Sequence, residues 1–172
     1  MNTEAVIRPF KEKDATDVRA LFVMINRLLS PPHLRNAFEA YIAHSLTEEM
    51  GRIVAYYSGR RGGFWVAVRE AKLVGMFGLE ATSPDALELR RMYVAPSARR
   101  AGVARSMLGF AEDECRRRKV RRLELSTSEL QPAALELYRR AGYHMLREVI
   151  AEQTSHKTVG GGIRRYHFEK WL

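Results

Sequence analysis

The sequence predicts a single α/β domain over residues 1–172, in which a mixed sheet carries helices on its faces. Two observations predict this class. The first third of the chain spaces its apolar residues three and four apart, which is typical of amphipathic helices. The remainder begins with aromatic and β-branched runs of strand length and continues as an alternation of strands and helices. A chain of 172 residues is long enough to bury one core and too short to expect two independent domains.

The N-terminal third opens with a short strand and is otherwise helical. The run "AVIRPF", residues 5–10, is strand-like, and Asp14 is the expected cap of a first helix that ends near the sequence "SPP". The segments 34–46 and 47–58 predict two further short helices, the second with an interruption at Gly51.

Strands and helices alternate in the rest of the chain. A short charged turn at Glu70 and Ala71 separates the first two strand-like runs, so these runs predict a hairpin. In the last predicted helix, Pro132 lies in the first turn and Gly142 lies just past the end, which is the usual asymmetry of helix termini. The predicted strands are 63–70, 72–80, 86–94, 121–127, 143–152 and 163–172, and the predicted helices are 103–119 and 131–141.

Composition and charge narrow the class of protein. The 46% hydrophobic and 28% charged content is ordinary for a globular chain, and no apolar run is long enough to cross a bilayer. The start lacks the apolar core of a signal peptide, and the lone Cys115 cannot form an internal disulfide, so we expect a cytoplasmic protein. The formal charge of +9 favours an anionic partner, which includes nucleic acid, acidic lipid and phosphorylated small molecules. The five histidines show no metal-ligand spacing, so no metal site is expected.

The stretch "RRMYVAPSARRAGVARSML", residues 90–108, joins a strand to a helix through a basic turn. Backbone N–H groups at such a helix start point outward together with the positive end of the helix dipole, which suits a diphosphate. Gly102 leaves the backbone accessible, and Arg99, Arg100 and Arg105 add positive charge. Taken alone, an arginine-rich glycine turn is more often a solvated surface turn.

The wider order of residues around this turn follows a recognisable signature. Arg99, Gly102 and Ala104 fill the pattern Arg or Gln, two residues, Gly, one residue, then Gly or Ala, with "ELRRMYVAP" before it and "ELQPAALELYRRAGY" after it. This order, from Glu88 to Tyr143, resembles the GCN5-related N-acetyltransferase (GNAT) superfamily. The resemblance implies a mixed, mostly antiparallel sheet with helices on both faces, and acetyl-CoA as cosubstrate. The flanks "AYIAHSLTEEMGRIVAYYSGRRGGFWVA" and "KTVGGGIRRYHFEKWL" resemble the camello-like branch, which includes acetyltransferases of cysteine conjugates.

The resemblance also implies which groups hold acetyl-CoA. The superfamily parts its cofactor strand from the next strand, so that the N–H groups of Met92 and Val94 would bind the pantetheine arm; the alternative is a plain core strand. An N–H near Met92 or Tyr93 would bind the carbonyl oxygen of the reacting thioester. Gln131 stands where the superfamily usually has asparagine and would contact CoA. The turn residues expected around the diphosphate are Arg99, Arg100, Ala101, Gly102, Val103, Ala104 and Arg105.

Two side chains are candidates for proton transfer. Glu88 matches the position from which some superfamily members draw a catalytic base for the amine, in phase with Arg90 and Met92 on one strand face. The alternatives are that Glu88 only pairs with Arg90, or that bound water is the base. Tyr138 matches the proton-donating tyrosine that would protonate the CoA thiolate; the alternative is a buried aromatic with a satisfied hydroxyl. Cys115 falls on the apolar stripe of its helix and is not expected to be a nucleophile.

These residues predict transfer of the acetyl group of acetyl-CoA to a primary amine, on a small molecule or a protein, by direct attack in a ternary complex. The alternatives are a non-catalytic acyl-CoA-binding regulatory protein of the same fold and, on charge alone, a nucleic-acid binder without a recognisable motif. We expect neither nucleic acid nor membrane as partner, and a homodimer is compatible with the sequence. Helices between about Leu28 and Ser58 should shape the acceptor pocket. The loop Thr158–Gly162 is either a gate for the acceptor or an exposed hairpin tip.

Overall fold

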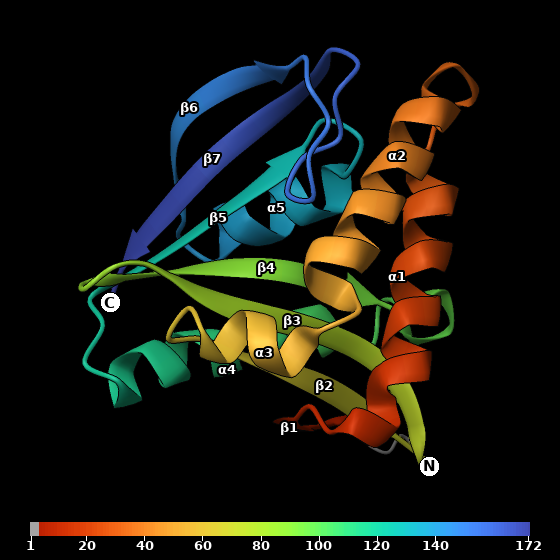
Figure 1. Ribbon diagram of the computed structural model, residues 1–172. Coiled ribbons are helices and arrows are strands. Elements are labelled where there is room, and N and C mark those ends of the chain that lie inside the picture. The colour runs from red at the N-terminus through yellow and green to blue at the C-terminus, as the bar shows by residue number, and fades with distance from the viewer. Residues whose placement is uncertain (1–3) are drawn as a thin grey trace.

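Seven strands form one sheet in the computed structural model, which describes residues 4–172 (Figure 1). Their order across the sheet is β1-β2-β3-β4-β5-β7-β6. β4 and β5 run parallel and the other neighbouring strands run antiparallel, so the predicted mixed, mostly antiparallel sheet is confirmed. The strands are β1 (Val6–Pro9), β2 (Gly63–Arg69), β3 (Lys72–Ser83), β4 (Ala86–Val94), β5 (Arg122–Ser128), β6 (His144–Ala151) and β7 (Ile163–Trp171).

Helices cover both faces of the sheet, as predicted (Figure 1). The helices are α1 (Ala15–Leu29), α2 (Arg35–Ser45), α3 (Ile53–Ser58), α4 (Val103–Arg117) and α5 (Pro132–Arg140). On one face, α1, α2 and α3 pack over a core that includes Phe22 and Met76. On the other face, α4 and α5 pack over a core that includes Phe77, Leu87 and Met107. Neighbours such as Met76 and Phe77 belong to different cores because strand side chains alternate between faces.

The turn between β2 and β3 confirms the predicted hairpin. Glu70 and Ala71 have φ angles of 51° and 61°, so both lie in the left-handed region that a two-residue type I′ turn requires. The strands on either side are rich in aromatic and β-branched residues, which explains why they pair although the turn contains no glycine.

Asp14 does not cap α1 as expected. Its carboxylate accepts two hydrogen bonds from Arg8, at 2.7 and 2.8 Å, and one from the N–H of Lys11 at 2.8 Å. These bonds hold a short 3-10 turn, Glu12–Asp14, against β1. Asp14 therefore fixes the approach of the chain to α1, and the helix starts at Ala15 without a side-chain cap.

The predicted interruption at Gly51 ends a π-helical turn, Leu46–Met50, that follows α2. Such turns insert one extra residue into a helix and are frequent at functional sites. This one carries Glu49, whose side chain is completely buried. A Cβ atom on Gly51 would lie 2.4 Å from the carbonyl oxygen of Leu46, so the turn can close only on glycine.

β4 and β5 pair only at their beginnings. Four residue pairs join them, the last being Leu89 with Leu125. After that point β4 continues beside β3, while β5 continues beside β7. The two parallel strands therefore diverge, and within the described part of the chain residues 90–94 have no strand partner on the β5 side.

A β-bulge at Arg91 interrupts β4 in its diverging part. Arg91 has a φ angle of 57°, and the register against β3 shifts there. A bulge adds one residue, so the alternation of faces is reversed beyond it. Glu88 and Arg90 share the face covered by α1, α2 and α3, whereas Met92 packs against the core under α4. The expectation that these three side chains share one face is therefore wrong for Met92.

Candidate active site

A cavity of about 660 Å³ lies where β4 diverges from β5. The end of β4, the turn before α4, the start of α5 and the end of α1 form its walls. Ala101, in this turn, and Arg105, near the start of α4, were also expected at the cofactor but do not line this cavity. The other predicted cofactor residues line it together with Tyr138: Met92, Tyr93, Val94, Arg99, Arg100, Gly102, Val103, Ala104 and Gln131.

The turn before α4 leaves its backbone N–H groups free. Arg100 and Gly102 have φ angles of 61° and 77°, and Gly102 directly precedes the first helical residue. Ser106 makes the first helical bond, to the carbonyl of Gly102 at 2.9 Å, and the N–H groups of Gly102 through Arg105 have no hydrogen-bond partner within residues 4–172. A Cβ atom on Gly102 would meet no atom of residues 4–172 within 4 Å. Glycine is needed here for its left-handed backbone, and the space in front of it is open to an anion.

The end of β4 offers further N–H groups to the same cavity. The N–H of Ala95 donates to the carbonyl of Val74 on β3 at 2.8 Å. Successive N–H groups of a strand point to opposite edges, so those of Met92 and Val94 point into the gap beside β5 and that of Tyr93 points toward β3. A peptide-like ligand can bind to the two free groups as an added strand would.

Tyr138, in the second half of α5, and Gln131, the residue before this helix, present polar atoms to the cavity. The ring of Tyr138 packs against Tyr143 and Phe168, with centroid distances of 5.9 and 6.2 Å. Its hydroxyl makes no hydrogen bond to a described residue and is not sealed from solvent, which argues against the satisfied hydroxyl of the alternative interpretation. Burial raises the pKa of Tyr138, so the phenol keeps its proton at neutral pH. The side-chain oxygen of Gln131 accepts a hydrogen bond from Thr127 at 3.2 Å, which leaves its NH₂ group available.

A second cavity of about 100 Å³ adjoins the first. Tyr138 and Gln131 line both, so the two cavities meet at these side chains. From the predicted acceptor helices, α1 and α2 contribute Leu29, Phe38 and Tyr41. The sheet and the loop between β6 and β7 contribute polar side chains: Glu88, Arg90, Arg91, Ser126, Thr127, Ser128, Lys157 and Arg165.

Glu88 lines this smaller cavity with a side chain that is 28% exposed. Its carboxylate lies 3.6 Å from Nε of Arg90, a looser contact than those of Arg90 with Glu80 at 2.6 Å and Glu49 at 2.8 Å. Burial raises the pKa of Glu88, although the charge of Arg90 opposes the shift. Arg90 is thus engaged mainly by other carboxylates, and Glu88 is left able to accept a proton.

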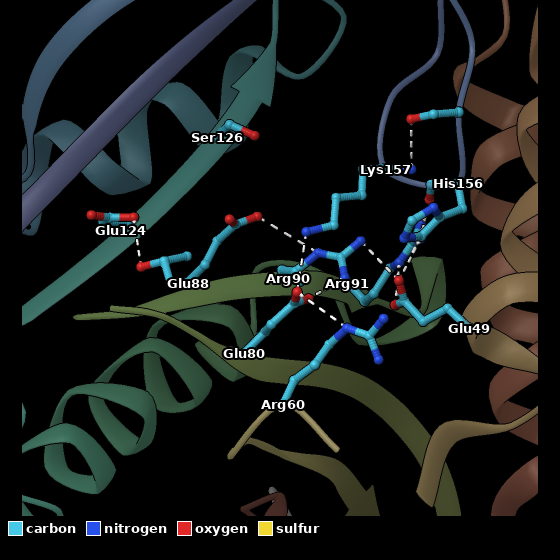
Figure 2. A network of polar contacts seen from close by, with 12 residues as sticks. Glu49, Arg60, Glu80, Glu88, Arg90, Arg91, Glu124, Ser126, His156 and Lys157 are labelled. Atoms are coloured by element: carbon cyan, nitrogen blue, oxygen red, sulfur yellow. Dashed lines mark hydrogen bonds and ion pairs between the residues drawn. The ribbon is translucent and has the colours of Figure 1, made fainter. Parts of the chain in front are cut away.

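Two arginines at the bulge belong to a buried ionic network (Figure 2). Nε and Nη2 of Arg91 donate to the two oxygens of Glu49 at 2.8 and 3.0 Å, and Nη2 of Arg90 lies 2.8 Å from Glu49 Oε1. The hydroxyl of Tyr57 donates to the same carboxylate at 2.7 Å. Burial alone would raise the pKa of Glu49, but the two guanidinium groups lower it to about 2. The ionised Glu49 therefore ties the bulge to the π-helical turn.

The loop between β6 and β7 is docked onto the same network (Figure 2). Arg91 donates to the carbonyl of His156, and Nζ of Lys157 donates to Glu80 at 3.1 Å. Val159 is buried in the core beneath α1 and α2. The interpretation of this loop as an exposed hairpin tip is therefore wrong for its middle part, and its role as a gate stays a prediction.

Sequence reasoning missed Glu49, Glu80 and Arg165 as parts of the site. For Glu49 a signal was present, because it lies four and seven residues before the buried Ile53 and Tyr56, so a charged side chain occupies the apolar stripe of a helix. No local signal marks Glu80 or Arg165, because strands expose charged residues on one face as a rule.

Three further observations concern a covalent route, a membrane span and a metal site. Cys115 is completely buried, and burial raises the pKa of its thiol to about 11. Among residues 4–172, no helix is both long and apolar enough to span a bilayer. The same residues contain no grouping of three or more His, Cys, Asp or Glu side chains suited to a metal ion.

Known proteins share both sequence and fold with this chain. It is 35% identical over 97 residues to the probable N-acetyltransferase 14 of Xenopus tropicalis, which covers 55% of this chain and 47% of that protein. It is 28% identical over 116 residues to the probable N-acetyltransferase camello of Xenopus tropicalis, covering 66% of this chain and 53% of that protein. The chain thus spans about half the length of these relatives.

A solved structure and a family model agree with the geometry. The PaiA N-acetyltransferase of Thermoplasma acidophilum, in complex with coenzyme A, has the same fold, with a TM-score of 0.75 at 16% identity over 98% of this chain and 99% of that chain. The model of the acetyltransferase (GNAT) family matches residues 24–143, which contain the diverging strands, the turn before α4, and α5. The chain therefore belongs to the acetyltransferase (GNAT) family.

Proposed function

We propose that this chain is an N-acetyltransferase that moves the acetyl group of acetyl-CoA to a primary amine by direct attack in a ternary complex. One observation carries the proposal: two cavities of different chemistry meet at Tyr138 and Gln131. The larger offers main-chain donors, which suit a diphosphate and a peptide-like pantetheine. The smaller offers ionised side chains, which suit a polar acceptor. A thioester bound at the junction is accessible from both sides.

Acetyl-CoA would lie along the larger cavity. The free N–H groups from Gly102 to Arg105 would bind the diphosphate, with positive charge from Arg99 and Arg100. The N–H of Val94 would bind a pantetheine amide, which leaves the N–H of Met92 for the carbonyl oxygen of the thioester. The coenzyme A complex of the PaiA relative supports a CoA cosubstrate for this fold.

The acceptor must be deprotonated before it attacks. A lysine-like amine with a pKa of about 10.4 is neutral in only about one of 2,500 molecules at pH 7. Glu88 would accept the proton, because it faces the smaller cavity and is not tightly paired. Burial raises the pKa of Glu88 toward neutral pH, which improves a carboxylate as a general base.

Charge that develops on the thioester must also be stabilised. The N–H of Met92 would donate to the carbonyl oxygen as it becomes an oxyanion, since this N–H faces the gap. The phenol of Tyr138 would donate its proton to the sulfur of the departing CoA. Transfer needs no covalent acetyl-enzyme, because Cys115 is buried and its thiol is kept protonated by a pKa of about 11.

Calorimetry and a CoA-release assay test this proposal. We expect the purified protein to bind CoA and acetyl-CoA, and to release free CoA from acetyl-CoA in the presence of primary amines. Absence of CoA binding would overturn the proposal. Binding without turnover across a broad amine panel would favour a non-catalytic acyl-CoA-binding regulatory protein instead.

Replacement of one tyrosine separates catalysis from binding. Tyr138→Phe removes the proposed acid, and we expect kcat to fall about 10- to 100-fold with CoA affinity retained. Tyr143→Phe is the matched control, because Tyr143 packs against the same ring but its hydroxyl donates to Glu112 at 3.0 Å, away from both cavities. Equal kcat values for the two variants would exclude Tyr138 as the acid.

A further inference from the structure

Arg165 is a cation without a carboxylate partner in the smaller cavity. It lies on β7, where Ile163 and Arg165 share the face that carries α1 and α2. Its Nη2 donates to the hydroxyl of Ser126 on β5 at 2.9 Å. Within residues 4–172, no carboxylate oxygen lies within 4.0 Å of its guanidinium nitrogens. One of its five N–H donors bonds to this neutral hydroxyl, and among the described residues none of the five has an anionic acceptor.

Each of the other cations of this cavity has a carboxylate partner in the chain itself. Arg90 and Arg91 both bind Glu49, and Arg90 and Lys157 both bind Glu80. Arg165 differs from these three, although burial acts on it as well and lowers its pKa. An arginine remains charged in a protein even when its pKa is lowered, so the unmet charge persists.

Arg165 faces the same cavity as the proposed base. In the sheet, Glu88 on β4 pairs with Glu124 on β5, and Ser126, two residues further along β5, accepts the hydrogen bond from Arg165. Glu88, Ser126 and Arg165 all line the cavity. One wall thus carries an anionic group suited to an ammonium and a cationic group suited to a carboxylate.

We propose that Arg165 binds a carboxylate of the acceptor, so that the preferred acceptors are small amines that carry a carboxylate close to the amino group, as amino acids do. This inference rests on the proposed acetyl transfer and adds the acceptor class. Guanidinium and carboxylate groups form paired, charge-assisted hydrogen bonds, which fix the orientation of the bound group. With its carboxylate at Arg165, a zwitterionic acceptor directs its amino group toward Glu88. The volume of about 100 Å³ accommodates such a small head group.

Paired acceptors test the inference directly. L-alanine, L-leucine and L-phenylalanine are each assayed beside the corresponding carboxamide, with acetyl-CoA saturating and product identified by mass spectrometry. The measured quantity is the ratio of kcat/KM for the acid to kcat/KM for the amide. We expect Arg165→Gln to lower this ratio about 10- to 100-fold, and Arg165→Lys to lower it less because the charge remains while the planar fork is lost.

Arg164→Gln is the matched control. Arg164 is the next residue of β7, is exposed and pairs with Glu148 at 2.7 Å, and does not line either cavity. We expect the ratio to be unaffected by this change. Calorimetry with CoA shows whether each variant is folded, because Arg165 lies outside the larger cavity.

The outcomes separate the two proposals. If CoA binds but no acid is acetylated in preference to its amide, or if Arg165→Gln leaves the ratio unchanged, the carboxylate inference is wrong and acetyl transfer to another amine class stands. If CoA does not bind, the proposed function itself fails. A fall in the ratio for Arg165→Gln but not for Arg164→Gln supports the inference.

Discussion

The two cavities that meet at Tyr138 are built by different means. The larger one presents mainly backbone N–H groups, from consecutive residues of the turn before α4 and from the end of β4. The smaller one presents ionised side chains from β4, β7 and the loop between β6 and β7. Main-chain donors depend on backbone conformation and suit a ligand that never changes. Side chains can be exchanged one at a time, which suits an acceptor that differs among relatives of one fold.

The largest effect on stability is expected for Glu49, whose ion pairs hold the arginines of the smaller cavity in place. Glu49→Gln leaves Arg90 and Arg91 without their shared carboxylate in a buried site, and loss of one member of a buried ion pair costs about 3–5 kcal/mol of unfolding free energy. Urea denaturation followed by circular dichroism measures this loss of unfolding free energy. Glu39→Gln is the control, because Glu39 pairs with Arg27 on the exposed surface, and we expect little change in midpoint.

The pH dependence of stability sharpens this prediction. Folding lowers the pKa of Glu49 from 4.5 to about 2, so its contribution is complete above pH 4.5 and is lost as the pH falls toward 2. We expect Glu49→Gln to flatten the stability curve in that interval. An equally steep curve in the variant would mean that other carboxylates dominate acid unfolding.

The next largest effect, on catalytic rate, is expected for the proposed base Glu88. Glu88→Gln should lower kcat/KM about 100-fold, because the amide cannot accept the proton of the amine. Burial raises the pKa of Glu88 above its ordinary value of 4.5, so the parent should lose activity as the pH falls through this raised pKa, and the variant should lack that limb. Glu124→Gln is the control, since Glu124 pairs with Glu88 across the strands but bonds to Thr82 and Arg122. An unchanged pH profile in Glu88→Gln would point to bound water as the base.

A smaller effect is expected for Gly102, and it tests whether the backbone of the turn before α4 binds the diphosphate. Gly102→Ala places a Cβ in the open space of the turn and strains a φ angle of 77°, so we expect acetyl-CoA affinity to fall about tenfold and stability by about 1 kcal/mol. Gly109→Ala is the control within α4, where the added Cβ also meets no atom within 4 Å, and it should stabilise the helix by about 0.5–1 kcal/mol. Calorimetry and thermal unfolding measure both. Unchanged affinity in Gly102→Ala would exclude the turn as the diphosphate site.

The smallest effect is expected for Cys115. Its thiol is buried and its pKa is about 11, so Cys115→Ala should keep kcat within about twofold of the parent. Mass spectrometry of the parent with acetyl-CoA and no amine should show no acetylated protein. Stoichiometric acetylation of Cys115 would replace direct transfer by a covalent route.

The difference between the cavities also explains what the sequence could predict. The span of β4, the hairpin at Glu70 and Ala71, and the start of α5 follow from local patterns of apolar, turn and proline residues, and the structure confirms them. The turn before α4 is likewise encoded by neighbouring residues. The bulge at Arg91 was not predictable, because nothing local requires a left-handed arginine. It is held by Glu49, which lies 42 residues earlier in the chain.

The same limit applies to the acceptor side. Arg165, Ser126 and Glu88 come together only through the strand order, in which β7 follows β5 although β6 precedes it in sequence. Spacing along the chain carries no information about such a contact. Residues of this kind become visible only when the sheet is assembled.

The short pairing of β4 with β5 predicts a locally unstable junction in the protein without bound cosubstrate. Among the described residues, four residue pairs join strands β1 to β4 to strands β5 to β7. The amide protons at this junction of β4 and β5 should therefore exchange faster than those of either half of the sheet. A pantetheine chain lying in the gap would add hydrogen bonds that the polypeptide lacks there. We expect the bound cosubstrate to hold the two halves of the sheet together, and so to slow amide exchange in β4 and β5 well beyond the residues that it contacts.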